Sequence, residues 1–307
     1  MSTKPFPQNG YRGRFAPSPS GELHFGSLLA AMASYADARS HKGSWLLRID
    51  DIDQARVVNY SDQHILTTLE QCGFEWDEHV TYQSQCIEHY QTALQELNQK
   101  QLTYSCDCSR KQLKALSHTD ANSHIYPGLC RNKGLTNYNN TAVRIKVPDK
   151  TIFFTDQIQQ YYNQQLSRDV GDFIIYRRDH IFSYQLSVVV DDFYSNISHI
   201  VRGYDLLDST PKQIYLQQLL NYPQPHYAHI PLAVSENNLK LSKLSQAKKV
   251  GSDLKTLLLA ADFLGQNPAR HGLKNHDFSN NNDFWHYLIA NWDINTVPKM
   301  EKQMIMV

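Results

Sequence analysis

Long apolar runs and net charge are both missing from this sequence of 307 residues. No stretch approaches the roughly 20 consecutive apolar residues that a membrane-spanning helix needs. The first ten residues contain one lysine and no apolar segment, which argues against a signal peptide. Lysine and arginine together number 30, as do aspartate and glutamate. We therefore expect a cytoplasmic protein with no membrane partner, which binds any nucleic acid through a local basic face.

Charged residues and cysteines are also scarce. Charged residues make up 20% of the chain, below the usual quarter, and hydrophobic residues make up 41%, enough for a substantial core. This balance argues against long disordered stretches. Only five cysteines are present, and three of them cluster at Cys106, Cys108 and Cys130. In a reducing compartment, such a cluster indicates a metal site before it indicates a disulfide.

Strand and helix patterns alternate along most of the chain. Residues 11–16 and 44–50 read as strands, the second with the apolar character of a buried parallel strand, and helical spacing of leucine and alanine begins between them at Gly26. Further helices are expected at 60–72, 85–100, 210–220, 253–264 and 283–290, and further extended segments at 142–147, 172–177 and 199–202. Thr210 is expected to cap its helix, with Pro211 at the first position. The order strand, helix, strand predicts an α/β fold with a doubly wound parallel sheet.

The segment 102–140 differs from its surroundings, because it is polar, contains cysteines and includes a Pro-Gly pair. We interpret it as a small insertion with its own scaffold. The predicted organisation is a catalytic domain at 11–101 and 141–250, the insertion at 102–140, and a short helical region at 251–307.

One block near the N-terminus carries most of the chemical information. It reads RFAPSPSGELHFGS over residues 14–27, and it joins a predicted strand to a predicted helix through a proline-rich loop. Amides at the start of a helix attract anions, Gly26 lets a ligand approach the backbone, and His24 can donate a hydrogen bond to a phosphoryl oxygen. These features favour a triphosphate site. Taken alone, such a block is more often a plain turn before a core helix.

A second block lies far downstream and reads LKLSKL over residues 239–244. Lys240 and Lys243 flank a serine in a short loop, and the basic pair Lys248 and Lys249 follows. A lysine on a mobile loop can neutralise the charge that develops on transferring phosphates. Taken alone, such a block is more often a solvated basic face.

Together the two blocks resemble the His-Ile-Gly-His and Lys-Met-Ser-Lys-Ser signatures of class I aminoacyl-tRNA synthetases, in the same order and with the same wide separation. The first block is similar to the glutamate branch of that family, and its Phe25-Gly26-Ser27 ending is similar to the short glutamyl-queuosine enzymes. Supporting blocks lie at 47–53, 188–192 and 200–207. The resemblance covers residues 11 to 250 and implies the Rossmann-type class I synthetase fold.

The resemblance also implies the roles of individual residues. His24 and Lys243 are expected to stabilise charge in the transition state. The residues assigned to ATP are Pro17, Gly26, Ser27, Lys240 and Lys243, and those assigned to glutamate are Arg14, Ser18, Asp50, Tyr184 and Arg202. Magnesium is expected with the ATP. The family usually has glutamate where this chain has Asp50, which is one methylene shorter, so its contact with the substrate ammonium is either direct or bridged by water.

The cysteine cluster suits tetrahedral zinc, because Cys106, Cys108 and Cys130 supply three thiolates. The resemblance supplies Tyr126 as the fourth ligand, whereas His124 is the commoner chemical candidate and His118 a weaker one. The other alternative is three buried free thiols, but a polar segment lacks the apolar core that would bury them. The sequence predicts one structural zinc ion per chain.

The implied reaction forms glutamyl-adenylate from L-glutamate and ATP, then transfers glutamate to the queuosine base in the anticodon of tRNA(Asp). The 57 residues after Val250 are too few for the anticodon-binding domain of a full-length glutamyl synthetase, so no separate domain of that kind is expected. The basic residues proposed to grip the RNA are Arg110, Lys111, Arg131, Lys133, Lys248 and Lys249.

Three alternative functions remain open from the sequence. The first is a compact glutamyl-tRNA synthetase that charges the 3′ end of tRNA(Glu). The second is a nucleotidyltransferase that adenylates a small acid and never contacts RNA. The third is a zinc-dependent RNA-binding protein with an inactive catalytic site.

Overall fold

The computed structural model describes residues 10–109, 111–113, 125–135, 140–234, 250–274 and 277–304. Several residues named from the sequence lie outside these ranges, so their predicted roles have no structural counterpart here. They are Arg110, His118, His124, Lys240, Lys243, Lys248 and Lys249.

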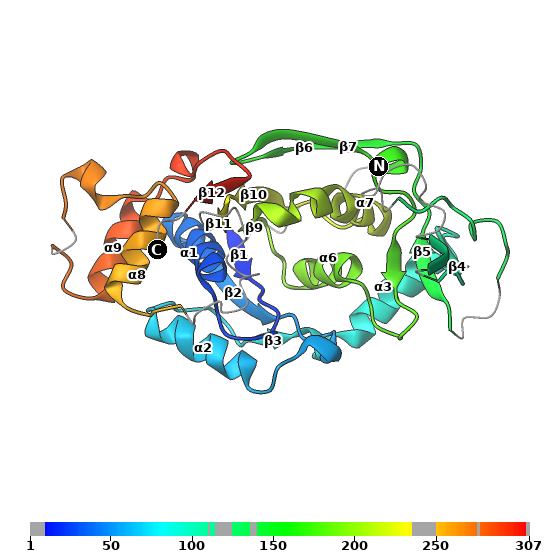
Figure 1. Ribbon diagram of the computed structural model, residues 1–307, viewed down its shortest axis with the longest axis horizontal. Helices are drawn as coiled ribbons and strands as arrows, with labels where there is room; N and C mark the ends of the chain where they lie inside the picture. Colours follow the sequence, from blue (N-terminus) through cyan, green and yellow to red (C-terminus); the bar gives the residue numbers. More distant parts are fainter. Residues whose placement is uncertain are drawn as a thin grey trace.

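The described helices and strands alternate along much of the chain, with a run of consecutive strands in its middle (Figure 1). The helices are α1 (Phe25–Ser40), α2 (Ser61–Gln71), α3 (Ile87–Gln99), α5 (Leu166–Asp169), α6 (Tyr184–Tyr194), α7 (Thr210–Leu220), α8 (Leu254–Phe263) and α9 (Asn281–Asn291). The strands are β1 (Arg12–Phe15), β2 (Ser44–Ile49), β3 (Thr81–Tyr82), β4 (Thr103–Cys106), β5 (Ala142–Ile145), β6 (Thr151–Asp156), β7 (Gln160–Gln165), β8 (Ile174–Tyr176), β9 (His199–Gly203), β10 (His226–Ile230), β11 (Leu232–Val234) and β12 (Lys302–Met304). Short 3-10 turns include η1 (Gln54–Arg56), η2 (Gln83–Gln85), η3 (Tyr204–Ser209), η5 (Pro268–His271) and η7 (Ile294–Thr296).

Parallel strands form the centre of the molecule. β1 pairs with β2 and β2 with β3, all parallel, and β9 pairs with β10 in the same way. The amide of Ser198, just before β9, donates to the Arg12 carbonyl at 3.0 Å, so β9 lies beside β1. The chain thus runs from β1 through α1 to β2, which is the predicted strand, helix and strand. The predicted α/β fold with a parallel sheet is confirmed.

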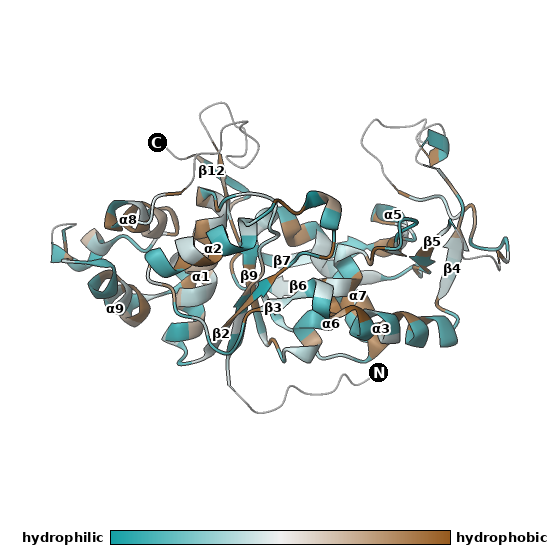
Figure 2. Cartoon of the chain, turned by 90° about the horizontal axis from the view of Figure 1, so that it is seen from below, coloured by the Kyte–Doolittle hydropathy of each residue, from teal (hydrophilic) through white to brown (hydrophobic). Residues whose placement is uncertain are grey.

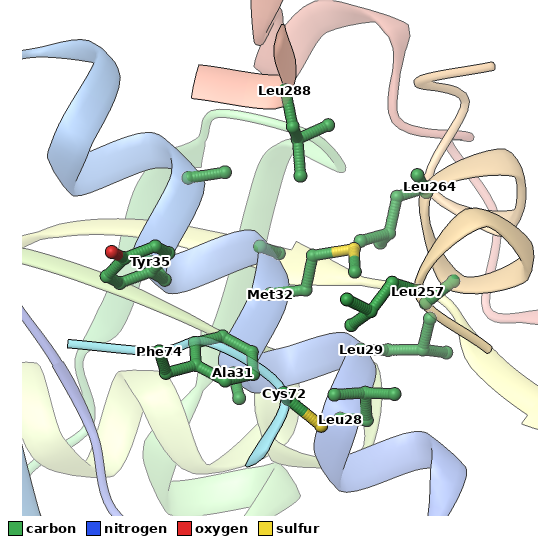
Figure 3. Close-up of a cluster of buried hydrophobic side chains, with 14 of the residues drawn as sticks. Leu28, Leu29, Ala31, Met32, Tyr35, Cys72, Phe74, Leu257, Leu264 and Leu288 are labelled. Atoms are coloured by element: carbon green, nitrogen blue, oxygen red, sulfur yellow. The ribbon is translucent and has the colours of Figure 1, made fainter. Parts of the chain in front are cut away.

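Helix α1 is the centre of the larger hydrophobic core (Figure 3). Its side chains Leu28, Met32 and Tyr35 are spaced three and four residues apart, so they fall on one face, and each is buried. Figure 3 shows Leu257 of α8 and Leu288 of α9 packed against this helix. Fully burying each such side chain contributes about 1.5–3 kcal/mol, so α8 and α9 stabilise the helix that carries the first sequence block.

The two C-terminal helices were predicted at nearly their observed positions, and Figure 2 shows that α8 and α9 each carry hydrophobic and hydrophilic faces. Strand β12, which pairs with β11, was not expected in this region. No helix in the described part of the chain combines the length and the apolarity needed to cross a membrane.

A three-stranded antiparallel sheet, in the order β4-β5-β8, holds the base of the predicted insertion. β4 belongs to the segment 102–140, whereas β5 and β8 follow it in the chain. A second core cluster joins this sheet to α3, α6 and α7 through buried residues that include Tyr90, Ile145 and Val190. The predicted insertion is therefore rooted in the same sheet as the segment that follows it.

One local prediction needs correction, and one hairpin was not predicted. Thr210 is not the cap of its helix but its first residue, because η3 runs directly into α7 and Ser209 takes the capping position. The Thr210 hydroxyl instead accepts a hydrogen bond from Arg202 at 2.8 Å. The hairpin of β6 and β7 was not predicted, although Ile152, Phe154 and Asp156 alternate inward along β6.

Candidate active site

A cleft of about 800 Å³ opens where the parallel strands β1, β2, β9 and β10 reach their carboxyl ends. Ligands of open α/β sheets bind at this edge. Nine residues predicted from the sequence to bind substrates line the cleft: Arg14, Pro17, Ser18, His24, Gly26, Ser27, Asp50, Tyr184 and Arg202. The two remaining predicted residues, Lys240 and Lys243, lie outside the described part of the chain.

His24 occupies the N-cap position of α1. Its Nδ1 accepts a hydrogen bond from the Ser27 amide at 3.2 Å, so in the neutral ring Nε2 carries the proton, and Nε2 lies 3.1 Å from the Ser27 hydroxyl. A Cβ on Gly26 would lie only 3.2–3.3 Å from the His24 ring. Glycine at this position therefore leaves room for the imidazole as well as for a ligand at the helix N-terminus.

A buried network of charges includes Arg14 and Asp50, which both line the cleft. Arg14 lies 3.2 Å from Asp192, and Arg48 lies 2.7 Å from Asp50, 2.8 Å from Asp192 and 3.5 Å from Asp191. The network thus holds three carboxylates against two guanidinium groups. With all groups ionised it carries one negative charge in excess, which suits a substrate cation.

Burial raises the pKa of each carboxylate in this network and the arginines lower it, so the result differs from one carboxylate to the next. For Asp192, burial favours the neutral acid, but Arg14 and Arg48 outweigh it and lower the pKa below its ordinary value. For Asp50, burial prevails over Arg48, so the pKa is raised. Burial also raises the pKa of Asp191 to about 6, although Arg48 opposes it and Tyr90 donates a hydrogen bond to this carboxylate at 2.6 Å.

The side chain of Arg202 is positioned by a hydrogen bond to a buried histidine. Its Nε donates to Nε2 of His229 at 3.0 Å, and Nδ1 of His229 lies 2.6 Å from Asp156 Oδ2. Because the guanidinium only donates, Nε2 of His229 must accept, and the ring proton sits on Nδ1 and is donated to Asp156. Burial lowers the pKa of His229 to about 4, which keeps the ring neutral. The Arg202 NH1 group is 3.5 Å from the Tyr184 hydroxyl, at the cleft.

Several of these residues were not singled out as site residues from the sequence. Arg48 sits in the apolar segment SWLLRID, and Asp191 and Asp192 follow the apolar run SVVV. Charged residues inside buried apolar segments are rarely tolerated without partners, and that was the available signal. His229 and Asp156 are far apart in sequence, so nothing local linked them to Arg202.

The cysteine cluster lies at the end of β4. The sulfur atoms of Cys106, Cys108 and Cys130 all lie within 4.8 Å of one another. The Tyr126 hydroxyl is 3.4 Å from the sulfur of Cys106 and 3.6 Å from that of Cys108. Three soft sulfur donors and one oxygen therefore converge on one point, a donor set that suits a metal such as zinc. His124 lies outside the described residues, so Tyr126 is the only one of the alternative ligands that can be located.

Two of the basic residues proposed for RNA binding already have acidic neighbours. Arg131 lies 3.5 Å from Asp172, and Lys133 lies 3.0 Å from Asp107. Lys111 is exposed. Lys133 and Asp107 are both exposed, so their ion pair contributes little to stability, whereas Asp172 is buried.

The parallel sheet, the loop after its first strand and the cleft at the carboxyl ends define the catalytic fold of a class I synthetase. The family of tRNA synthetases class I (E and Q), catalytic domain, matches residues 11–259. Glutamyl-Q tRNA(Asp) synthetase of Ectopseudomonas mendocina is 46% identical over 260 residues, 84% of this chain and 86% of that protein. The protein of the same name from Neisseria meningitidis serogroup B is 44% identical over 296 residues, 94% of this chain and 98% of its own length. The chain belongs to the class I (E and Q) synthetases and, within them, to the family of glutamyl-Q tRNA(Asp) synthetases.

Solved structures agree on the fold. The crystal structure of the glutamate-tRNA synthetase from Elizabethkingia anophelis superposes with a TM-score of 0.80 at 23% identity, covering 96% of this chain and 68% of that one. A glutamate tRNA ligase from Elizabethkingia meningosepticum, in complex with its amino acid, superposes with a TM-score of 0.79. The resemblance inferred from the two sequence blocks is confirmed.

Proposed function

We propose that this enzyme activates L-glutamate with ATP and transfers the glutamyl group to queuosine in the anticodon of tRNA(Asp). The observation that carries the proposal is the gathering of nine predicted substrate-binding residues around one cleft. The names of the relatives from Ectopseudomonas mendocina and Neisseria meningitidis support the choice of acceptor.

Glutamate recognition follows from the charges at one end of the cleft. Arg202 is the proposed partner of a substrate carboxylate, since a guanidinium can form two parallel hydrogen bonds to it. Asp50, a member of the network with one excess negative charge, is the proposed partner of the α-ammonium, directly or through one water. Arg14 and Ser18 complete this end, with Tyr184 at its rim.

ATP is proposed to bind at the other end, where Pro17, Gly26 and Ser27 line the cleft. The N-terminus of α1 attracts the phosphates, and His24 can donate to a phosphoryl oxygen. Magnesium is proposed to bind with the ATP phosphates. Lys240 and Lys243 of the second sequence block are proposed to bind these phosphates.

In the first step, a carboxylate oxygen of glutamate attacks the α-phosphorus of ATP, and pyrophosphate leaves. In the second step, a hydroxyl oxygen of the acceptor attacks the carbonyl carbon of glutamyl-adenylate. The new ester bond forms as the bond from that carbon to the phosphate oxygen breaks. AMP departs and takes up the hydroxyl proton, so the protein contributes positioning and charge stabilisation.

The metal of the cysteine cluster is proposed to be one zinc ion, held by Cys106, Cys108, Cys130 and Tyr126. When bound, zinc cross-links β4 to the segment that follows it. The proposed domain bounds are a catalytic domain at 11–101 and 141–250, an insertion at 102–140 and a helical region at 251–307. We propose a cytoplasmic location, because ATP and tRNA are both available there.

Pyrophosphate exchange tests the activation step. Glutamate should drive exchange between ATP and labelled pyrophosphate, and an inactive RNA-binding protein would show none. Labelled glutamate should then enter RNA, which excludes a nucleotidyltransferase that acts without RNA. Label that enters tRNA(Glu), and disappears when periodate oxidises the 3′ end, would identify a compact glutamyl-tRNA synthetase instead.

A further inference from the structure

A second cavity, of about 250 Å³, adjoins the cleft, and we call it the side cavity. It lies between the loop after β1, the loop after β2 and the turn that leads from β8 into α6. It shares five lining residues with the cleft: Ser18, Ser20, Asp50, Arg56 and Tyr184. The side cavity is therefore a branch of the cleft.

The shared residues identify which end of the cleft this branch joins. Ser18, Asp50 and Tyr184, three of the residues proposed to bind glutamate, line both spaces. Among the described residues, those proposed for the nucleotide line only the cleft: Pro17, His24, Gly26 and Ser27. A group in the side cavity therefore meets the amino acid and not the triphosphate.

We propose that the side cavity binds the acceptor, a small cyclic diol carried on a secondary ammonium as in the queuosine side chain. This inference rests on the proposed function. The acceptor hydroxyl must reach the carbonyl carbon of the bound glutamyl group, so it has to enter at the amino-acid end. At 250 Å³, the side cavity equals the volume of roughly eight water molecules in the liquid, which suits one small ring and not a whole nucleotide.

Asp53 offers the matching charge for the ammonium. Its Oδ2 accepts a hydrogen bond from Arg177 at 2.7 Å and lies 3.4 Å from Arg56. Its other oxygen, Oδ1, is buried and has no hydrogen-bond partner among the residues that the structure describes. Asp53 precedes η1 without capping it through its side chain, and its two arginine partners engage Oδ2 and leave Oδ1 unused. A donor from the acceptor would satisfy the unpaired oxygen.

Ser183, which also lines the side cavity, offers a hydroxyl. It occupies the N-cap position of α6, yet its side chain makes no capping hydrogen bond. Its Oγ is buried and likewise has no partner within the described part of the chain. The backbone holds the residue in place, because its amide donates to the Ile175 carbonyl at 3.0 Å. A ring hydroxyl of the acceptor can pair with this side chain.

Apolar side chains complete the side cavity. Ile52 and Val57 come from the loop after β2, and Phe182 precedes α6. They offer a surface for the carbon ring of the acceptor, between the charged group and the hydroxyl. The side cavity thus combines two carboxylates, the two arginines that pair with Asp53, several hydroxyls and an apolar wall. The unpaired oxygens of Asp53 and Ser183 can receive the polar groups of a small ring.

The test compares two isosteric variants that remove a carboxylate beside the same arginine. Asp53→Asn changes a residue that lines the side cavity. Asp179→Asn changes the other carboxylate partner of Arg177, which accepts a hydrogen bond from the Arg177 Nε at 3.0 Å. Asp179 does not line the side cavity. Ser183→Ala is a second variant of the side cavity. For each protein, glutamate-dependent pyrophosphate exchange and transfer of labelled glutamate to queuosine-containing tRNA(Asp) are measured.

Asp53→Asn should lower kcat/KM for transfer about tenfold or more, as expected when a charge-assisted hydrogen bond is lost. Ser183→Ala should lower it less, and Asp179→Asn should behave like the wild type. Exchange should stay within about twofold in all three variants. Equal loss of transfer in Asp53→Asn and Asp179→Asn, or a raised KM for glutamate in the Asp53→Asn exchange assay, would overturn the assignment. Absence of transfer by the wild type would overturn the proposed function itself, whereas transfer by the wild type and by Asp53→Asn alike overturns only the side cavity.

Discussion

The cleft and the cysteine cluster each bring charged or ionisable groups close together, but the two regions differ in what balances those charges. In the cleft, Arg14 and Arg48 lie within 3.5 Å of the carboxylates that they balance, so the side chains are positioned by one another. In the cluster, three sulfur donors and the Tyr126 hydroxyl face the same point. Arg144 stacks on the Tyr126 ring at 3.7 Å and interacts favourably with the Cys106 thiolate, but one guanidinium does not balance three thiolates. The cleft is organised before its ligands arrive, whereas the cluster is organised for a cation.

The largest expected effect is therefore removal of the metal. Chelation should abolish the fixed geometry around Cys106 to Cys130, because structural zinc supplies about 10–16 kcal/mol of apparent binding free energy in small sites. Metal analysis of protein purified without chelators should give one zinc per chain, and Cys130→Ser should lose it. Cys86→Ser, at a half-buried cysteine outside the cluster, is the control and should retain zinc. If the purified protein contains no zinc and its three thiols titrate freely, the cysteine cluster does not bind a metal ion.

The fourth ligand can be settled separately. Tyr126→Phe should weaken zinc binding if the hydroxyl is a ligand, whereas replacement of His124 should leave it bound. The reverse pattern would assign the position to His124.

The next effect concerns charge that develops during the reaction. Lys243→Ala should raise the activation free energy of pyrophosphate exchange by about 2.7–4 kcal/mol, which lowers kcat by about 10²–10³. This is the usual loss for one donor that acts in the transition state. KM should change less, because the interaction is absent in the ground state. Lys255→Ala, on the exposed part of α8, is the control. Unchanged exchange in the Lys243 variant would exclude this lysine from the mechanism.

A smaller effect on glutamate binding is expected from changes to Asp156 and His229, which position Arg202. Asp156→Asn keeps the shape of the side chain but can present an N–H to His229 Nδ1. The ring proton would then move to Nε2 and oppose the Arg202 Nε, which is now 3.0 Å away. We expect KM for glutamate to rise about tenfold, since roughly 1–3 kcal/mol is lost when a buried donor is unsatisfied.

The control for this variant is Asp208→Asn, which alters a hydrogen bond of the same hairpin at Tyr162 and does not contact His229. Protein stability should be measured alongside KM. A loss of stability with an unchanged KM in Asp156→Asn would show that the histidine supports the fold and not Arg202.

The smallest effect is on acid stability. Burial lowers the pKa of both His199 and His229 to about 4, below the ordinary value of 6.5. The unfolded chain therefore binds more protons between these values, so the free energy of unfolding falls as the pH drops from 6.5 towards 4. Asp191, with its pKa raised to about 6, opposes this trend below pH 6.

Urea unfolding at pH 7.5, 6.2 and 5 checks this prediction. His199→Gln cannot take up the proton and should lose part of the pH dependence. His89→Gln, which removes another histidine stacked on a tyrosine, is the control. Identical pH dependence in the wild type and His199→Gln would contradict the proposed role of burial.

The features that were predicted correctly from the sequence all depend on local structure. Residues 14–27 combine strand, rigid loop and helix start, so the placement of His24 and Gly26 follows from local structure. Asp156, His229 and Arg202 meet only because the β6–β7 hairpin packs beside β10, a long-range contact without a local pattern. The side cavity could not be predicted for the same reason, because Asp53 and Ser183 come from loops that are far apart in the chain. Predicted elements such as α8 and α9 had clear helical spacing, whereas β12 is too short to show any.

The most direct test of the proposed function compares two preparations of one tRNA. Labelled glutamate and ATP are supplied with tRNA(Asp) from cells that make queuosine and with the same tRNA from cells that lack it. The enzyme should label only the first. Equal labelling of both preparations would contradict queuosine as the acceptor.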